Sequence, residues 1–374
     1  MDTTVAQVLA RFGSWFPPAT AQSWDAVGTV CGDPTGPARR VLLAVDVTSE
    51  VVAEAVDRQV DLVIAHHPLL LKGVHGIDVT HPKGRMVHDL ITAGIVLHCA
   101  HTNADIGPYG TVESLAAALG VTDRRPLRPT GADAMDTLVT HVPADHVDAV
   151  VTALSEAGAG AVGDYERCFF AAPGTGSFRP LPGAEPFLGT VDEVAEVAEQ
   201  RVELVLPRHR RDAVVRALLR AHPYEEPSWQ VLEHAEVSLD RGLGRIGSVA
   251  PTTVGEFARL VADTLPATAA GLRVAGELDR PVRTVAVQAG AGDDLLDTAR
   301  AAGADLYLTS DLRHHPASEA AQWPDGPALI DVPHWAAEWM WLPVLESKLC
   351  KEFEGLEVHV STIPTDPWTA HVNR

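Results

Sequence analysis

The first indication of the architecture is a short run of sequence, Asp61-Leu62-Val63-Ile64-Ala65-His66-His67-Pro68. Its apolar part predicts a buried strand over 61–65, and Pro68 ends regular strand pairing just beyond it. Outward from this run the pattern recurs, and we expect strands at 41–45 and 94–100 and helices at 49–59 and about 84–93. Near-continuous apolar strands separated by helices indicate βαβ units and an α/β fold whose sheet is covered on both faces.

The C-terminal part of the chain resumes this α/β pattern. Strands are expected at 282–287, 304–308 and 328–331, with helices at 293–302 and from about Pro333 onward. The two α/β stretches therefore read as the halves of one core that the middle of the chain interrupts.

The middle of the chain contains an internal repeat. Each copy is an apolar strand that ends in Val142-Pro143 or Leu206-Pro207 and leads into an amphipathic helix. Further strands are expected at 168–170 and 229–232, so the two copies together predict a βαββαβ, ferredoxin-like module. Between the copies, the segments 174–180 and 186–189 are expected to form a loop rich in glycine and proline.

The chain of 374 residues is long enough for two to three domains of ordinary size. Two segments, 124–136 and 234–247, are rich in charged residues and in breakers of regular structure, and we place the domain boundaries there. The expected domains are the first half of the α/β core at 1–130, an inserted ferredoxin-like domain at 136–240 and the second half of the core at 246–374.

The composition argues against several classes of protein. Fifty acidic against 29 basic residues give a net charge of −21, so we expect binding to neither nucleic acids nor anionic membranes. No apolar run approaches the roughly 18 residues of a membrane span, and the start of the chain lacks the pattern of a secretory signal. We therefore expect a cytoplasmic protein.

The cysteines and histidines narrow the choice of metal ligands. The four cysteines lie far apart and none forms a Cys-x-x-Cys pair, which argues against a disulfide framework or a thiolate zinc site. Any metal would then be bound by nitrogen and oxygen. Seven of the 17 histidines fall between His66 and His101, a clustering that asks for an explanation.

Polar side chains follow the ends of four expected strands. The strand ends lead into His66 and His67, into His101 and Asp105, into Asp311, Arg313 and His314, and into His334. Because ligands of open α/β sheets bind outside the carboxyl ends of the strands, these groups could converge on one crevice.

Two pairs of these residues have the spacing of metal ligands. His66 and His67 can approach one site from a bent loop, although a core histidine beside a solvated one would give the same pattern. His334 and Glu338 share a helix face, although an exposed polar face or a simple His–Glu pair would do so too. With Asp105, the three imidazoles and two carboxylates suit two divalent ions, which could be Zn, Mn, Fe(II) or Co. Glu338 could bridge the two ions, and a single ion with Glu338 as general base is the alternative.

Several short motifs, taken in their order and spacing, carry a family resemblance. They are Trp24-Asp25-Ala26-Val27-Gly28, Ala65-His66-His67-Pro68-Leu69, His101-Thr102-Asn103-Ala104-Asp105, Gly242-Leu243-Gly244-Arg245-Ile246-Gly247, Thr309-Ser310-Asp311 and Asp331-Val332-Pro333-His334 followed by Glu338. By these motifs the chain resembles, over nearly its whole length, the GTP cyclohydrolase I type 2 homologues, also described as Nif-like dinuclear metal-centre proteins. The middle module, with Gly174-Thr175-Gly176 and His222-Pro223-Tyr224-Glu225-Glu226-Pro227, is similar to the CutA/PII-like insert of the family's longer members.

The resemblance implies a discontinuous Nif-like core of two α/β/α halves around the insert. It also implies a toroidal homohexamer whose metal sites face an internal cavity. The family's ligands for two divalent metal ions fall on His66, His67, Asp105, His334 and Glu338, with Glu338 as the bridge. Two positions depart from the family pattern, because Ala26 replaces the usual Asn and Ser310 the usual Gly.

We expect a metal-dependent hydrolase that acts on a small molecule, a nucleotide among the candidates, and the family name implies ring opening of GTP. Residues that could support the ligands or contact the substrate are His101, Asp311, Arg313 and His314, although local hydrogen bonding would explain them equally. Gly290-Ala291-Gly292 could approach a phosphate, although a plain strand-to-helix turn is the simpler interpretation. The rival function is a non-catalytic, metal-loaded scaffold, chaperone or regulator whose insert senses a small molecule.

Overall fold

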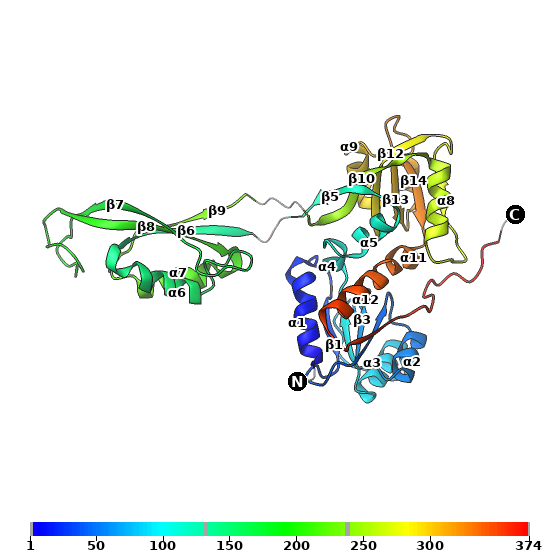
Figure 1. Ribbon diagram of the computed structural model, residues 1–374, viewed down its shortest axis with the longest axis horizontal. Helices are drawn as coiled ribbons and strands as arrows, with labels where there is room; N and C mark the ends of the chain where they lie inside the picture. The colour runs from blue at the N-terminus through cyan, green and yellow to red at the C-terminus, as the bar shows by residue number, and fades with distance from the viewer. Residues whose placement is uncertain (1–2, 131–133, 236–239, 373–374) are drawn as a thin grey trace. The chain divides into compact units, whose positions relative to one another are not determined.

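The computed structural model describes residues 3–130, 134–235 and 240–372. The chain divides into two compact units, a first unit of Met1–Thr130 with Ser238–Arg374 and a second unit of Gly131–Val237 (Figure 1). Helices and strands mix in both units, with three sheets among the described residues, which confirms the predicted α/β class. Within the described ranges, no helix combines the length and the apolar character needed to cross a bilayer.

The first sheet of the first unit has four parallel strands and one antiparallel strand. Its order is β1 (Gly28–Cys31), β4 (Val96–Cys99), β3 (Leu62–Ala65), β2 (Arg40–Ala44) and β15 (Glu357–Val360), with β1 antiparallel to β4. All residues of β3 are buried, as its apolar run predicts. The sequence did not reveal β15, which pairs with β2 and so brings the C-terminal half of the core into this sheet.

Helices cover both faces of the first sheet (Figure 1). They are α1 (Val5–Trp15) and α12 (Trp341–Glu352) on one face, and α2 (Ser49–Asp57) and α3 (Pro82–Thr92) on the other. Within β2, Leu43 packs into the core under α1 and α12, whereas Leu42 packs into the core under α2 and α3. Because successive strand residues alternate between two covered faces, the strands read as continuous apolar runs.

The second sheet of the first unit has six strands. Its order is β11 (Arg273–Ala275), β14 (Ala328–Val332), β13 (Leu306–Ser310), β12 (Pro281–Ala291), β10 (Gly242–Thr253) and β5 (Thr122–Pro129). The surrounding helices are α5 (Thr111–Ala118), α8 (Val254–Thr264), α9 (Leu296–Ala301), α10 (His314–Ala320) and α11 (His334–Trp339). On α11, Ala336 belongs to the core of the first sheet and Ala337 to a core of the second, so this short helix joins the two.

The charged segments 124–136 and 234–247 are only partly connections between domains. Residues up to Pro129 belong to β5 and residues from Gly242 belong to β10, and these two strands pair with each other in antiparallel register. Backbone partners so distant in sequence stabilise strands despite the local prolines, glycines and charges. The parts of both segments at 131–133 and 236–239 lie outside the described residues.

The second unit is a four-stranded antiparallel sheet with two helices. Its strand order is β7 (Phe170–Phe178), β8 (Ala195–Pro207), β6 (Met135–Pro143) and β9 (Trp229–Glu233), and its helices are α6 (Val147–Glu156) and α7 (Arg211–Ala221). Both helices pack on one face, where Leu138 and Val202 belong to the same buried core as Val150 and Leu218. Short 3-10 turns of the two units are Pro18–Thr20, Ala144–His146, Arg208–Arg210 and Asp293–Leu295.

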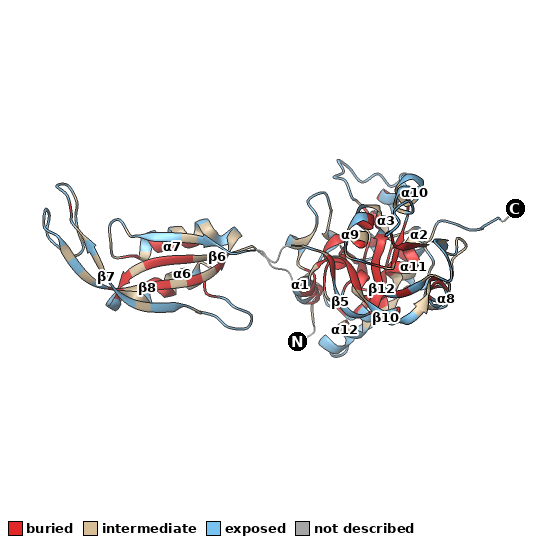
Figure 2. Ribbon diagram, turned by 90° about the horizontal axis from the view of Figure 1, so that it is seen from above, coloured by how far each residue is buried: buried red, intermediate tan, exposed pale blue. Residues whose placement is uncertain are grey.

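The prediction of a loop at 174–180 is wrong for most of this segment. Gly174 to Phe178 belong to β7 and pair with β8 in regular antiparallel register, with Gly174 opposite Glu199. At Gly176 the strand leaves little room for a side chain, because a Cβ there would lie 2.3 Å from a carboxylate oxygen of Glu199. In Figure 2, β7 is largely exposed or intermediate, whereas the neighbouring β8 and β6 contain the buried residues.

Candidate metal centre

The polar residues expected at strand ends meet within the first unit. His66 and His67 directly follow β3, and Asp105 ends α4 (Thr102–Asp105), which lies just beyond β4. His334 and Glu338 lie one turn apart on α11, which begins immediately after β14 and Pro333. The extended backbone at Pro333 ends the strand, and its fixed φ suits the entry into the helix.

The Glu338 carboxylate lies at the centre of this group. Its Oε1 is 3.3 Å from Nε2 of His66 and 2.9 Å from Nε2 of His334, and its Oε2 is 3.1 Å from Nε2 of His67. The same Nε2 of His66 also lies 3.5 Å from Oδ1 of Asp105. Both His66 Nε2 and Glu338 Oε2 are buried without a hydrogen-bond partner in the described chain, although charged or polar atoms surround them.

The other ring nitrogen of each imidazole has a partner of its own. Nδ1 of His67 is 2.8 Å from Oδ1 of Asp46, and Nδ1 of His334 is 2.6 Å from Oδ2 of Asp311. Nδ1 of His66 lies 2.9 Å from the backbone carbonyl of Ala100. Since each acceptor requires Nδ1 to carry the proton, Nε2 is left to face the Glu338 carboxylate with a lone pair when the ring is neutral.

His101 adds a fourth imidazole beside the cluster. Ligand nitrogens of His66, His67 and His101 all lie within 4.8 Å of one another. Nδ1 of His101 is 2.8 Å from Oδ1 of Asp25, and the other oxygen of Asp25 accepts the backbone N–H of Thr102 at 3.0 Å. Asp25 therefore positions His101, and the departure from the family pattern at the next residue leaves this contact intact.

The carboxylates and imidazoles of the cluster strongly shift one another's pKa values. Burial lowers the pKa of His67, but the carboxylates of Glu338 and Asp46 outweigh burial and raise it to about 11. For His334, Glu338 and Asp311 likewise outweigh burial and raise the pKa to about 10. Burial would raise the pKa of Glu338, but the surrounding imidazoles hold it well below its usual range.

Of the four residues expected to support the ligands or contact the substrate, two lie at the cluster and two do not. His101 and Asp311 join the cluster, Asp311 with a left-handed backbone at φ 56°. Arg313 instead forms an ion pair with Asp293, and its side chain is exposed. His314 is exposed at the start of α10, where its ring contacts His315, so the structure does not bring these two residues to the cluster.

Sequence reasoning missed two residues that shape the site. Asp46 lies two residues beyond the end of β2, and the rule that polar groups at strand ends converge would have found it. Gly290, which we interpreted as part of a turn, lies at the end of β12 with φ 76°. A Cβ there would lie 2.7 Å from Oε1 of Glu338 and 3.2 Å from Nε2 of His334, so only glycine leaves room for both side chains.

A cavity of about 740 Å³ adjoins the cluster. Its walls include Asp46, His67, Asp311 and His334 on one side. The C-terminal segment forms another part of the wall and contributes Thr365, Trp368 and His371. The hydroxyl of Thr365 donates to the second carboxylate oxygen of Asp46, which ties this segment to the partner of His67.

The donor set fits divalent cations. Two groups of three side chains have ligand atoms within 4.8 Å of one another, His66 with His67 and His101, and His67 with His334 and Glu338. Imidazole and carboxylate donors suit borderline divalent metals, and the partners on Nδ1 are the usual outer support of such sites. The buried orphan atoms His66 Nε2 and Glu338 Oε2 are what a cation would satisfy.

Comparison with known proteins agrees with the motifs. A family model described as Duf34/NIF3 (NGG1p interacting factor 3) matches residues 3–367. A Mycobacterium leprae protein described as "GTP cyclohydrolase 1 type 2 homolog" is 44% identical over 377 residues, covering 100% of this chain and 97% of its own. Among solved structures, a Bacillus cereus protein related to NIF3 is 33% identical with a TM-score of 0.78, covering 99% of both chains. A Staphylococcus aureus protein is 29% identical with a TM-score of 0.82 over 99% of both chains, so the similarity extends over both units.

Removing the carboxylate behind His67 tests whether the site is organised as described. We expect Asp46→Ala to weaken Zn²⁺ binding by about 10–100-fold, because Nδ1 of His67 loses the acceptor that orients the ring. Competition with a chromophoric chelator measures the affinity. The exposed Asp57 on α2 provides the matched control, and Asp57→Ala should bind as the parent does. Equal losses in both variants would contradict the role of Asp46.

Proton release on metal binding tests the electrostatics. His67 and His334 have raised pKa values of about 11 and 10, so in the ion-free protein both carry protons at about pH 7. Their stabilising charge is present below the unfolded pKa and is lost as the pH rises through these values. A cation must displace these protons, so affinity should rise by about tenfold per pH unit for each proton displaced. Calorimetry in two buffers of different ionisation enthalpy measures the release, and identical heats in both buffers would refute it.

Proposed function

The chain belongs to the Duf34/NIF3 family, and on that premise we propose that it is a metal-dependent hydrolase with a dinuclear centre that acts on a nucleotide or related small molecule. The observation that carries the proposal is the buried Glu338 carboxylate with Nε2 atoms of three histidines within 3.3 Å. A structural ion pair needs one imidazole, whereas three imidazoles and a second carboxylate form a ligand set for two ions.

In this proposal His66, His67, Asp105, His334 and Glu338 would together hold two divalent ions. Zn, Mn, Fe(II) and Co all suit these donors. Two such ions would supply Lewis acidity, a water of lowered pKa and a clamp on developing negative charge. The chain's own contribution is a set of ligands held rigid by Asp46, Asp311 and the carbonyl of Ala100.

The adjoining cavity supports a small-molecule substrate. Its volume of about 740 Å³ is in the range of small-molecule sites. Trp368 offers an exposed aromatic face in its wall, and His67 and His334 place the ligand cluster at its edge. Behind the cluster, the buried Trp341 packs edge-on against the ring of His66, so water is excluded from that side. His101, positioned by Asp25, is assigned as a group that could support the ligands or contact the substrate.

Further parts of the proposal rest on the family resemblance. They are a discontinuous core around a CutA/PII-like inserted domain, a homohexameric assembly and a location in the cytoplasm. The rival function is a non-catalytic metal-loaded scaffold or regulator. Such a protein would use the same ligand cluster to hold metal but would catalyse no reaction.

Metal content and turnover test the proposal together. Elemental analysis of protein purified without chelators should give two equivalents of divalent metal per chain, whereas a mononuclear site with Glu338 as general base gives one. The loaded protein is then incubated with GTP and a panel of nucleotides, phosphoesters and cyclic amides. His67→Ala should reduce kcat/KM by at least about a hundredfold, since losing a ligand exceeds the loss of an outer partner.

The exposed His88 on α3 supplies the matched control, and His88→Ala should retain full turnover and metal content. Turnover that survives His67→Ala in folded protein would reject this centre as the active site. Absence of turnover across the panel, with two bound metals, would favour the scaffold.

A further inference from the structure

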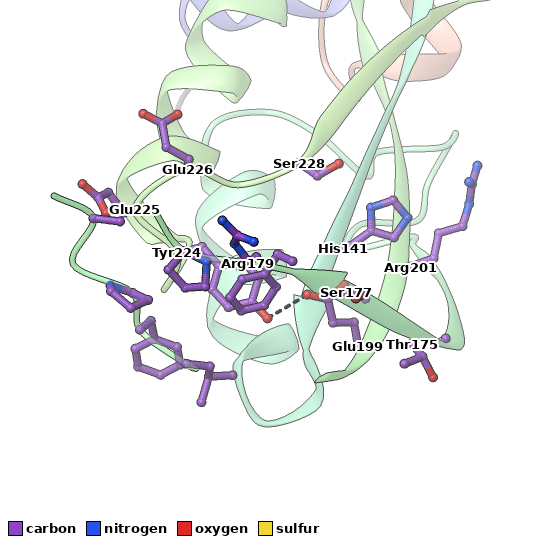
Figure 3. A pocket seen from close by; sticks show the side chains of 18 of the residues that line it. His141, Thr175, Ser177, Arg179, Glu199, Arg201, Tyr224, Glu225, Glu226 and Ser228 are labelled. Atoms are coloured by element: carbon purple, nitrogen blue, oxygen red, sulfur yellow. Dashed lines mark hydrogen bonds between the residues drawn. The ribbon is translucent and has the colours of Figure 1, made fainter. Parts of the chain in front are cut away.

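The second unit contains a cavity of about 720 Å³ that belongs to no part of the metal centre (Figure 3). Strands β7 and β8 form its floor, and the segments 180–188 and 224–228 supply the walls. Apolar atoms provide most of its lining, which also includes the charged side chains of Arg179, Glu199 and Arg201 and the imidazole of His141.

The middle of β7 presents only small residues on the face that lines this cavity, with Phe170 and Phe178 on the same face at the two ends of the strand. Residues two apart in a strand share a face, so Ala172, Gly174 and Gly176 line up on the same side. Their partners on β8 include Arg201 opposite Ala172 and Glu199 opposite Gly174. A Cβ on Gly174 would meet nothing within 4 Å, so this position is open to the cavity.

Glu199 places a carboxylate in this floor. The residue is only 9% exposed, and its Oε1 accepts the phenolic hydrogen of Tyr224 at 2.7 Å. No other hydrogen bond to Glu199 occurs in the described part of the chain, and no Lys, Arg or His nitrogen lies within ion-pair distance of it. Oε2 of this carboxylate lies beside Gly176 and is left as an acceptor.

Aromatic rings gather at the same end of the cavity. The ring of Tyr224 lies 6.0 Å from that of Phe178 and 6.3 Å from that of Phe187. The loop that carries Phe187 is anchored, because the backbone N–H of Glu185 donates to Oε2 of Glu225 at 3.0 Å. The rings are tilted against one another and form one aromatic cluster, whose outer face can pack against a planar molecule.

We propose that this cavity binds a planar heteroaromatic molecule that presents two neighbouring N–H donors on one edge, as a guanine ring does. An ionised carboxylate can only accept hydrogen bonds, so Glu199 matches an edge of two donors and rejects an edge that places an acceptor beside a donor, as adenine does. Tyr224 donates to one oxygen and fixes the carboxylate in the floor, while Phe178 and Phe187 provide apolar contact for the ring. The site is distinct from the proposed active site and does not depend on it.

Calorimetric titration of the full chain with guanosine, inosine and adenosine tests this proposal. Guanosine should bind at least tenfold more tightly than adenosine, and inosine, which lacks the 2-amino donor, should fall between them. Glu199→Gln should remove the preference for guanosine over adenosine. Gly176→Ala retains the charge but displaces the carboxylate, and should weaken guanosine binding at least tenfold.

The matched control is Glu196→Gln, an exposed glutamate on the opposite face of the same strand, which should bind guanosine as the parent does. Thermal denaturation and metal content of each variant confirm that both units are folded. Absence of guanosine binding, equal affinity for adenosine, or full binding in both Glu199→Gln and Gly176→Ala would overturn the proposal. Loss of guanosine binding in His67→Ala but not in Glu199→Gln would also overturn it, because the nucleoside would then occupy the metal centre.

Discussion

A single carboxylate, that of Glu338, is placed where water scarcely reaches, with a residue exposure of 2%. A buried anion of this kind is tolerated only where positive charge and hydrogen-bond donors surround it. The Nε2 atoms of His66, His67 and His334 supply that environment. Without a metal ion, the raised pKa values of His67 and His334 keep these rings protonated at neutral pH. Their positive charges then balance the carboxylate in the way that bound metal ions would.

The architecture follows from the need to bring these side chains together. The short helix α11 contributes to the cores of both sheets of the first unit, which places Glu338 within reach of the loop after β3. Strand β15 pairs with β2, and the chain beyond it continues past Ser361, whose hydroxyl donates to Glu54, to Thr365. The segment that lines one part of the cavity therefore follows directly from the C-terminal strand.

Local sequence patterns were sufficient for much of this arrangement. The apolar strands and the polar residues that follow them are visible within a few positions, so His66, His67, Asp105, His334 and Glu338 could all be named as candidates. Contacts between distant segments could not be read in this way. Gly290 looks like an ordinary turn glycine until α11 is packed beside it, and β7 looks like a loop until β8 supplies its backbone partners.

The fold brings some of the candidate residues together and leaves others apart. Arg313 and His314 follow a strand end as Asp311 does, but the backbone turns at Asp311 and directs them toward Asp293 and His315.

The measurement that tests the account most directly is anomalous X-ray diffraction, recorded on both sides of the zinc absorption edge from crystals of zinc-loaded protein. We predict two anomalous peaks per chain flanking the carboxylate of Glu338, one beside His66 and one beside His67 and His334. A single peak, or peaks away from Glu338, would contradict the account.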